Sequence, residues 1–271
     1  MKFENIRTFN FENALRGMRN PKESYRLSDS YYGLAFNDPE TILGLTNQQK
    51  YEVIYKDGDI CEYVSIGPKD MELAQRLIFG GSEHRKFMRQ IMVSVDITAP
   101  LYWWKEFDTY KVGTVANSTS TMHTIMKSPI TFDKFEISDF VNLPYPAVRQ
   151  RKDAKSLADS DFVQIHLIPY LEYLREEYLW VDENEADEER KEALKEIIWK
   201  ELIRWLPESW MQTRTVTMNY ENLLAMCGRG QRRFHKLSEW SGKNRTEEYE
   251  SFIKFARSLP YAQDLIFIDE K

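Results

Sequence analysis

The stretch Arg89 to Ile97, RQIMVSVDI, carries the clearest strand signal in this chain and decides how its surroundings are interpreted. Every second residue is apolar and β-branched, and the set is Ile91, Val93, Val95 and Ile97. A period of two predicts a β-strand with one buried face. Pro100 follows closely, and the segment behind it, LYWWKEFDTYK, predicts a helix because proline is tolerated in a first helical turn.

Upstream of this strand, the sequence predicts a short helix at 11–18, a β-hairpin formed by 51–55 and 60–66, and a helix at 70–79. The hairpin is predicted because two runs rich in β-branched and aromatic residues flank the turn residues Asp57-Gly58. The short helix is expected to end at Asn20, since a proline disfavours helix in the residue before it.

Downstream, the sequence predicts a mainly helical segment at 161–210, a short strand at 214–217, and helices at 219–227 and 247–259. The acidic run between Asp182 and Glu189 is interpreted as a solvated loop followed by an acidic first helical turn. Strands interspersed with helices, without regular βαβ spacing, indicate the α+β class with a mixed sheet. We expect a single domain over residues 1–271 with a helical insertion at about 156–210.

Composition excludes several classes of protein. The 271 residues include 15 Phe, 15 Tyr and 7 Trp, which supply far more burial than a disordered chain carries. No apolar run is long enough to span a membrane. A net charge of −6 argues against a broad face for duplex nucleic acid. Two cysteines and no recognisable secretory signal lead us to expect a cytoplasmic protein.

Common catalytic motifs are absent from the sequence. It contains no Gly-x-Ser-x-Gly, no phosphate-binding Gly-x-x-x-x-Gly-Lys-Ser/Thr loop and no Gly-x-Gly-x-x-Gly. Its four histidines are scattered without ligand spacing, namely His84, His123, His166 and His235. We therefore expect no metal site.

The segment from Trp103 to His123 has an unusual chemistry. Six of the eight residues from Thr114 to Thr121 carry a hydroxyl or an amide. Such side chains beside a lysine suit a phosphate or another small anion. The alternative is a Ser/Thr-rich turn that caps a helix, and the composition of the segment leaves both interpretations open.

From about Asp70 to His123, and again from Thr213 to Ala256, the sequence resembles the flavin-dependent thymidylate synthases. Gly81 and Glu83-His84 are similar to the glycine and LEH-like step of that family. The family signature Arg-His-Arg-x-x-Ser, Asn-Glu-x-Ser-x-Arg-Tyr corresponds to TYKVGT at 109–114 and NSTSTMH at 117–123. The stretch TRTVTMN at 213–219, followed by Leu223 and Met226, is similar to the family's T-x-x-x-T-x-N-x-x-x-L-x-x-F block.

The Arg-His-Arg signature itself is not kept. Thr109 and Tyr110 replace its first two members, and only the cation at Lys111 remains. Lysine offers a point charge where arginine offers a bidentate fork, which weakens geometric control of a phosphate or a flavin carbonyl. Ser118 takes the place of the family's glutamate, and Met122 that of its second arginine.

The resemblance implies a fold, a reaction and an assembly. The implied reaction is methylation of dUMP, or a related pyrimidine nucleotide, at C5, with methylene-tetrahydrofolate, FAD and NADPH and without a cysteine nucleophile. The implied assembly is a homotetramer with sites between subunits. A non-catalytic or repurposed nucleotide-binding protein that has lost FAD is the alternative, and a structural protein that assembles through its aromatic surface is a third interpretation.

The resemblance also implies roles for individual residues. Those expected to contact the flavin are His84, Tyr110, Asn117 and Asn219. Those expected to bind the nucleotide are Glu106, Lys111, Thr114, Ser118, Ser120 and Arg214. Arg229 or Arg232 is expected to polarise the uracil carbonyl as the catalytic arginine.

Overall fold

The structure is a computed structural model that describes residues 1–38, 40–41, 52–137, 162–228 and 233–270. The chain divides into two compact units, which are described separately below. The first comprises residues 1–98, 105–117 and 214–271, and the second comprises 99–104 and 118–213. The predicted insertion at 156–210 lies within the second unit.

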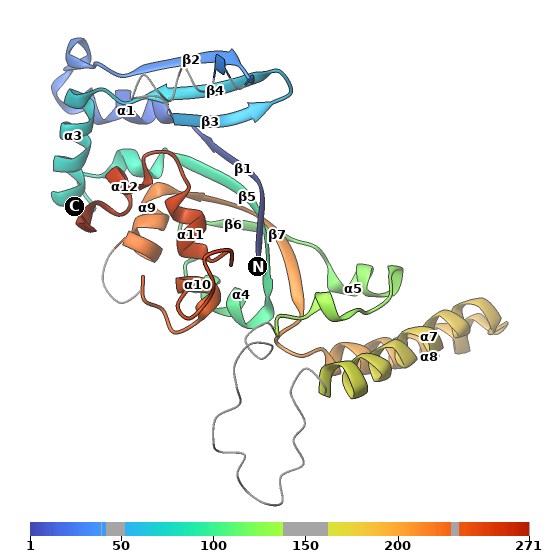
Figure 1. Cartoon of the computed structure of the whole chain (residues 1–271). Coiled ribbons are helices and arrows are strands. Elements are labelled where there is room, and N and C mark those ends of the chain that lie inside the picture. Colours follow the sequence, from blue (N-terminus) through green and yellow to red (C-terminus); the bar gives the residue numbers. More distant parts are fainter. Residues whose placement is uncertain (39, 42–51, 138–161, 229–232, 271) are drawn as a thin grey trace, which may run out of the picture. The chain divides into compact units, whose positions relative to one another are not determined.

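A four-stranded sheet is built from strands that lie far apart in the sequence (Figure 1). Its order is β1-β5-β7-β6, formed by Lys2–Phe9, Met92–Pro100, Met211–Asn219 and Val115–Ser118. The predicted buried face of β5 is confirmed, since Val93, Val95 and Ile97 have no exposed surface. The strand starts later than predicted because Lys86–Arg89 form a 3₁₀ turn before it. The strand predicted at 214–217 is longer than expected and is β7.

A second sheet has three antiparallel strands in the order β2-β4-β3, formed by Tyr31–Phe36, Ile60–Ser65 and Glu52–Asp57. The pairing of β3 with β4 confirms the predicted hairpin. Its turn contains Gly58 at φ 52°, a left-handed conformation that glycine adopts without strain.

The helices of the first unit are short. They are α1 (Phe11–Arg19), α3 (Pro68–Phe79), α9 (Tyr220–Leu223), which continues as a π-helix at Leu224–Gly228, α10 (Ser238–Ser241), α11 (Phe252–Arg257) and α12 (Ala262–Leu265). Three of the four predicted helices in this unit are confirmed. The helix predicted at 247–259 is shorter than expected, because the Ser251 hydroxyl caps α11 by accepting a hydrogen bond from the Lys254 amide.

The helix predicted after Pro100 is α4 (Leu101–Phe107), which ends four residues earlier than expected. Thr109 explains this end, since its backbone N–H and its hydroxyl both donate to the Glu106 carbonyl oxygen. A hydroxyl that bonds the nearby main chain competes with continued helix.

The second unit is mainly helical, as predicted. Its elements are α5 (Thr121–Thr124), a π-helix at Val163–Leu167, α7 (Ile168–Asn184) and α8 (Glu188–Trp205). Asp187 caps α8 by accepting from the Arg190 amide at 3.0 Å, and Glu188 and Glu189 lie in the first turn. The acidic helix start is therefore confirmed, whereas Asp182 and Glu183 belong to the last turn of α7, so the loop is shorter than predicted.

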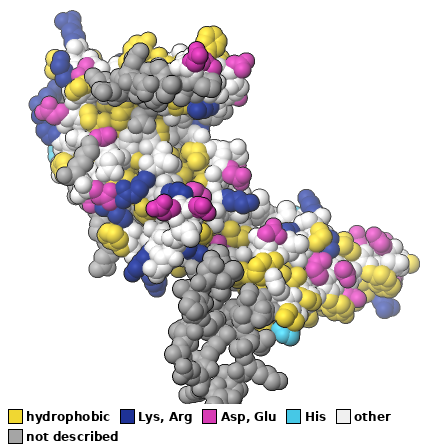
Figure 2. Space-filling model, viewed as in Figure 1, with side chains coloured by type: hydrophobic (Ala, Val, Ile, Leu, Met, Phe, Trp, Pro, Cys, Tyr) yellow, Lys and Arg dark blue, Asp and Glu magenta, His cyan; other side chains and the backbone are white. Residues whose placement is uncertain are grey.

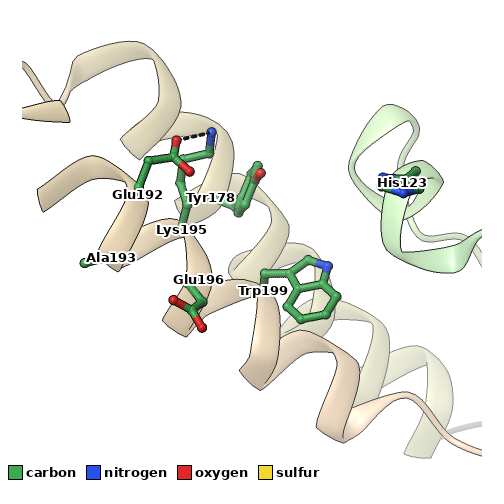
Figure 3. Close-up of a pocket in the computed structure, with 7 residues that line it drawn as sticks. All are labelled: His123, Tyr178, Glu192, Ala193, Lys195, Glu196 and Trp199. Carbon is green, nitrogen blue, oxygen red and sulfur yellow. Dashed lines mark hydrogen bonds and ion pairs between the residues drawn. The ribbon is translucent and has the colours of Figure 1, made fainter. Parts of the chain in front are cut away.

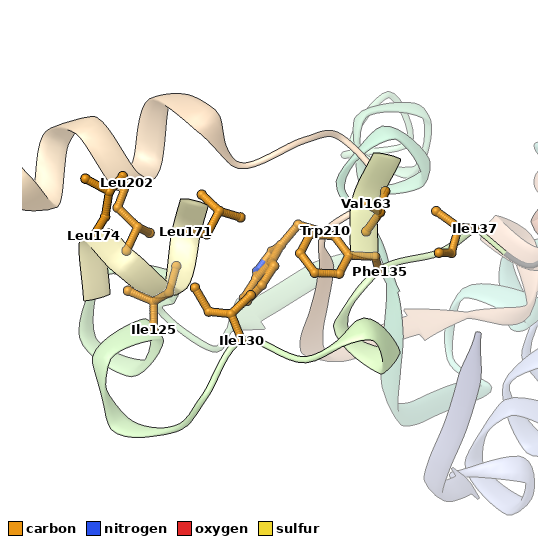
Figure 4. Close-up of a cluster of buried hydrophobic side chains, with 9 residues drawn as sticks. All are labelled: Ile125, Ile130, Phe135, Ile137, Val163, Leu171, Leu174, Leu202 and Trp210. Atoms are coloured by element: carbon orange, nitrogen blue, oxygen red, sulfur yellow. The ribbon is translucent and has the colours of Figure 1, made fainter. Parts of the chain in front are cut away.

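The core of the second unit gathers apolar side chains from Ile125, just after α5, to Trp210, beyond the end of α8 (Figure 4). Leu171 and Leu202 are fully buried, and Phe135 meets Trp210 edge-to-face with ring centroids 5.4 Å apart. Other apolar side chains on the two long helices stay exposed, as Figure 2 shows, among them Trp180, Ile197 and Trp205. No helix in the described ranges is both long and apolar enough to cross a bilayer.

Candidate functional site

One predicted site residue, Asn219, lies where the loop after α4 contacts the start of α9. The Asn219 side-chain oxygen accepts from the Asn222 amide at 2.9 Å, and the Asn222 oxygen accepts from the Asn219 amide at 3.1 Å. Asn222 also donates from Nδ2 to the Val112 carbonyl at 2.6 Å. This reciprocal cap therefore holds both the helix start and the loop that carries Lys111 and Thr114.

Gly113 is the point of closest approach in this loop. Its φ is 83°, and a Cβ there would lie 3.0 Å from Asn219 Nδ2. A side chain at this position would be strained by its backbone conformation and would push the loop off the cap.

An aromatic cluster lies beneath Tyr110. Its ring lies 5.6 Å from that of buried Trp240, measured between centroids, and His235 lies 5.5 Å from the same Trp240. His235 Nδ1 accepts from the Leu237 amide at 3.1 Å, so a neutral ring carries its proton on Nε2. That nitrogen lies 3.5 Å from a carboxylate oxygen of Glu106.

His235 and Trp240 were not predicted as site residues. They are separated from Tyr110 by more than a hundred residues, and only tertiary packing brings them together. The only local signal was the sequence of basic residues before His235, which is equally typical of a helix end.

Two predicted nucleotide-binding residues, Arg214 and Thr114, already make hydrogen bonds within the protein, which limits the contacts they can make with a ligand. Arg214 Nη1 lies 3.0 and 3.2 Å from the two carboxylate oxygens of Asp108. The Thr114 hydroxyl donates to the Tyr110 carbonyl at 2.6 Å. A hydroxyl has one proton, so in this arrangement Thr114 can only accept from a ligand.

The remaining hydroxyl-rich residues line an exposed edge. Lys111 is exposed, and so are Asn117 and Ser118, which belong to the edge strand β6. Ser118 and Ser120 lie in the second unit, where Ser120 precedes α5 and its carbonyl accepts from the Thr124 hydroxyl at 2.8 Å. Ser120 is the N-cap residue of α5, but its side chain makes no capping hydrogen bond, so these contacts do not decide between the two interpretations of the segment.

His84 lies on a separate cavity of about 380 Å³ in the first unit. The cavity is formed between the end of α1, α3 and the turn after α3, and its apolar walls include Met18, Leu73, Leu77 and Phe87. Lys22, Lys86 and Glu83 also line it. An apolar cavity with a few charged groups suits a ligand with a planar apolar body and an anionic part.

One ion pair connects the His84 turn to α9. Arg85 Nε lies 2.9 and 2.8 Å from the two carboxylate oxygens of Glu221, two residues after the capping Asn219. The His84 cavity and the Asn219 cap are therefore attached to adjoining elements of one unit. Arg229 and Arg232 lie outside the described residues.

Neither cysteine has the surroundings of a nucleophile. Cys61 and Cys227 are both fully buried and unpaired with each other. Burial raises the pKa of the Cys227 thiol well above its usual range, with a smaller opposing effect from Arg233. Within the described ranges, no group of three or more His, Cys, Asp or Glu side chains is arranged to hold a metal ion.

The comparisons with known proteins bear on the fold. No protein-family model matches the sequence, and no curated protein matches it. Among solved structures, the chain is similar to the flavin-dependent thymidylate synthase ThyX from Helicobacter pylori complexed with FAD and dUMP, with a TM-score of 0.51 and 17% identity over 99% of each chain. The chain has the fold of ThyX.

A second structure of Helicobacter pylori ThyX with FAD and dUMP is similar with a TM-score of 0.50 and 15% identity. It covers 99% of this chain and 98% of that one. The match to ThyX confirms the expected α+β, thymidylate synthase-like fold. At such low identity the similarity establishes the fold, and function has to be argued from the site.

Proposed function

We propose that this protein is a divergent flavin-dependent thymidylate synthase that methylates dUMP, or a related pyrimidine nucleotide, at C5. The observation that carries the proposal is the match of 99% of the chain to the fold of an enzyme complexed with FAD and dUMP. Methylene-tetrahydrofolate would supply the carbon unit and NADPH the hydride. We further propose a homotetramer in the cytoplasm, in keeping with the family resemblance.

The residues present fit a flavin. The cavity beside His84 has apolar walls for a planar ring, and Lys22 and Lys86 could neutralise phosphates. Asn219 and Asn117 offer amides, and Tyr110 offers an aromatic ring. When bound, the flavin would supply the redox chemistry, while the protein positions the reactants.

Nucleotide binding would depend on the loop after α4. The exposed Lys111 would attract the phosphate, and the hydroxyls of Ser118 and Ser120 would donate hydrogen bonds to it, as would that of Thr114 once it leaves the Tyr110 carbonyl. Arg214 would contribute from β7, with Asp108 holding its guanidinium in place. Glu106 would accept a hydrogen bond from the nucleotide, and Arg229 or Arg232 would polarise the base carbonyl.

A specific observation favours the alternative, a nucleotide-binding protein without flavin. Thr109 and Tyr110 stand where the family has arginine and histidine, and the proton of the Thr114 hydroxyl is already donated to the main chain. Fewer donors then remain for a flavin and a nucleotide together.

Titration of the purified full-length protein with FAD, and separately with dUMP, distinguishes these functions. The synthase requires saturable FAD uptake, seen as a shifted flavin absorbance band, and an increase in melting temperature with dUMP. A protein that takes up no FAD and is stabilised by dUMP is the binding protein. A protein that responds to neither ligand contradicts both functions and leaves the structural interpretation.

A further inference from the structure

A second cavity lies entirely within the second unit, and none of its lining residues is assigned to the proposed reaction, although the His123 amide donates to the carbonyl of Ser120 at 3.1 Å. It has a volume of about 520 Å³ and opens between α5 and the α7–α8 hairpin (Figure 3). The side chains that matter here are His123, Tyr178, Trp199, Glu192, Lys195 and Glu196. None of them is needed to bind FAD or dUMP in the function proposed above.

Three rings from three helices face this opening. Figure 3 shows Trp199 of α8 on the side of the α7–α8 hairpin that faces α5 and its His123, and Tyr178 of α7 next to Lys195. Trp199 and Tyr178 are half-buried, so the helices hold their side chains while part of each ring stays accessible. Accessible aromatic faces of this kind stack on planar heteroaromatic rings.

The one lysine in the wall is already occupied. Lys195 Nζ lies 2.8 Å from Asp182 Oδ1 and 3.2 Å from Glu192 Oε1, and 5.3 Å from the centroid of the Tyr178 ring. An ammonium group has three N–H donors, and the two carboxylates engage two of them. The charge of Lys195 is balanced by these carboxylates, and the nearby acidic side chains of Asp182, Glu192 and Glu196 disfavour a phosphate, so the site disfavours charged nucleotides.

The two glutamates that line the cavity, Glu192 and Glu196, can each accept further hydrogen bonds. Glu192 contacts Lys195 through one oxygen, and its side chain is 71% exposed. Glu196, also exposed, forms an ion pair with Lys200 through one oxygen. A carboxylate has about four lone-pair positions, so each can accept a further hydrogen bond, and an amino group on a ring edge is the matching donor.

We propose that this cavity binds an uncharged planar heteroaromatic ring that carries an exocyclic amino group, such as the base of an adenine nucleoside. The ring stacks among Trp199, Tyr178 and His123, and the amino group donates to Glu192. The proposal stands apart from the proposed synthase function, because none of the residues that line the cavity is assigned to that reaction.

Calorimetric titration of the full-length protein with adenosine, and with inosine as the matched nucleoside that lacks the amino group, tests this site. We expect saturable adenosine binding and weaker inosine binding. Trp199→Ala should weaken adenosine binding roughly 10-fold, an effect typical of losing one stacking ring. Trp205→Ala, on the same helix outside the cavity, should leave it unchanged.

Two further variants test the role of Glu192 and distinguish this cavity from the proposed active site. Glu192→Gln should reduce the preference for adenosine over inosine without disturbing the fold, since Glu192 is exposed. Lys111→Ala should leave adenosine binding unchanged even where it weakens dUMP binding, which separates this site from the proposed active site. Absence of saturable heat with adenosine, or equal binding by wild type and Trp199→Ala, would overturn the proposal.

Discussion

Arg19 of α1 and Asp70 of α3 form a buried ion pair, with 2.6 Å between Nε and Oδ1 and exposed side-chain fractions of 4% and 0%. The other carboxylate oxygen of Asp70 accepts from the hydroxyls of Ser28 and Ser30, each at 2.6 Å. One carboxylate thus ties α1, α3 and the entry to the three-stranded sheet together. This arrangement also fixes the α1 and α3 walls of the His84 cavity.

Asp70→Asn should therefore destabilise the protein strongly. Breaking a buried pair by removing one charge leaves the other uncompensated and costs about 3–5 kcal/mol. Chemical denaturation followed by circular dichroism measures the free energy of unfolding. Glu72→Gln, an exposed change on the same helix, is the matched control and should have little effect.

The same carboxylate predicts an acid-sensitive fold. Burial by itself would raise the pKa of Asp70, but hydrogen bonds from Ser28, Ser30 and Arg19 outweigh it and lower the pKa. The stabilisation is present above the unfolded-state pKa of about 4 and is lost as pH falls through the lower folded-state pKa. Below about pH 4, the free energy of unfolding should decrease as the pH falls, and it should decrease more steeply in wild type than in Asp70→Asn. Equal pH dependence in the two proteins would exclude this role of Asp70.

Lys111→Ala should weaken dUMP binding by about 1.5–3 kcal/mol, the usual value of a hydrogen bond to a charged group. Isothermal titration with dUMP measures the change. Lys69→Ala removes another exposed lysine from the same unit and should leave the affinity unchanged. Equal affinities for wild type and Lys111→Ala would remove Lys111 from the site.

The C-terminal turn is held by two arginines of unequal importance. Arg233 contacts Asp269 and Glu270 at 2.6 Å each and also donates to the carbonyls of Cys227 and Gly228. Arg257 contacts Glu270 at 2.7 Å and is 39% exposed. Arg233→Met should lower the unfolding free energy by about 1.5–3 kcal/mol, and Arg257→Met by less than about 1 kcal/mol. Thermal melting of the two variants measures which one loses more stability. A larger loss in Arg257→Met than in Arg233→Met would refute this description of the turn.

Both cysteines should be inert in the folded protein. Cys61 and Cys227 have no exposed surface, and the raised pKa of the Cys227 thiol leaves little reactive thiolate there. A thiol reagent at pH 8 should label neither residue until denaturant is added. Cys61→Ser with Cys227→Ser should retain FAD and dUMP binding; rapid labelling of native protein would contradict the burial.

The buried strand and most helices were predictable because their patterns are local. Strand β1 was not predicted, and a β-bulge explains why. Asn5 has φ 53°, and the pairing of β1 with β5 shifts between Glu4 and Arg7, so the apolar residues do not alternate. A period-two search fails wherever such a bulge breaks the register.

Site residues could be predicted only where the signal for them lies in one continuous stretch of sequence. The segment from Trp103 to His123 was singled out by its composition, and the individual site residues, Asn219 among them, by resemblance to family motifs. The partners of these residues could not be found in this way. Trp240 under Tyr110, His235 beside Glu106 and Asp108 against Arg214 are contacts made by folding, and no spacing in the sequence encodes them.

Release of tritium from dUMP labelled at C5 tests the central proposal most directly, because that hydrogen leaves when a carbon unit is attached there. With FAD, NADPH and methylene-tetrahydrofolate, the full-length protein should release label to water and form thymidylate, and omission of FAD should stop both. Protein that binds FAD and dUMP yet releases no label above the rate without protein would contradict the account.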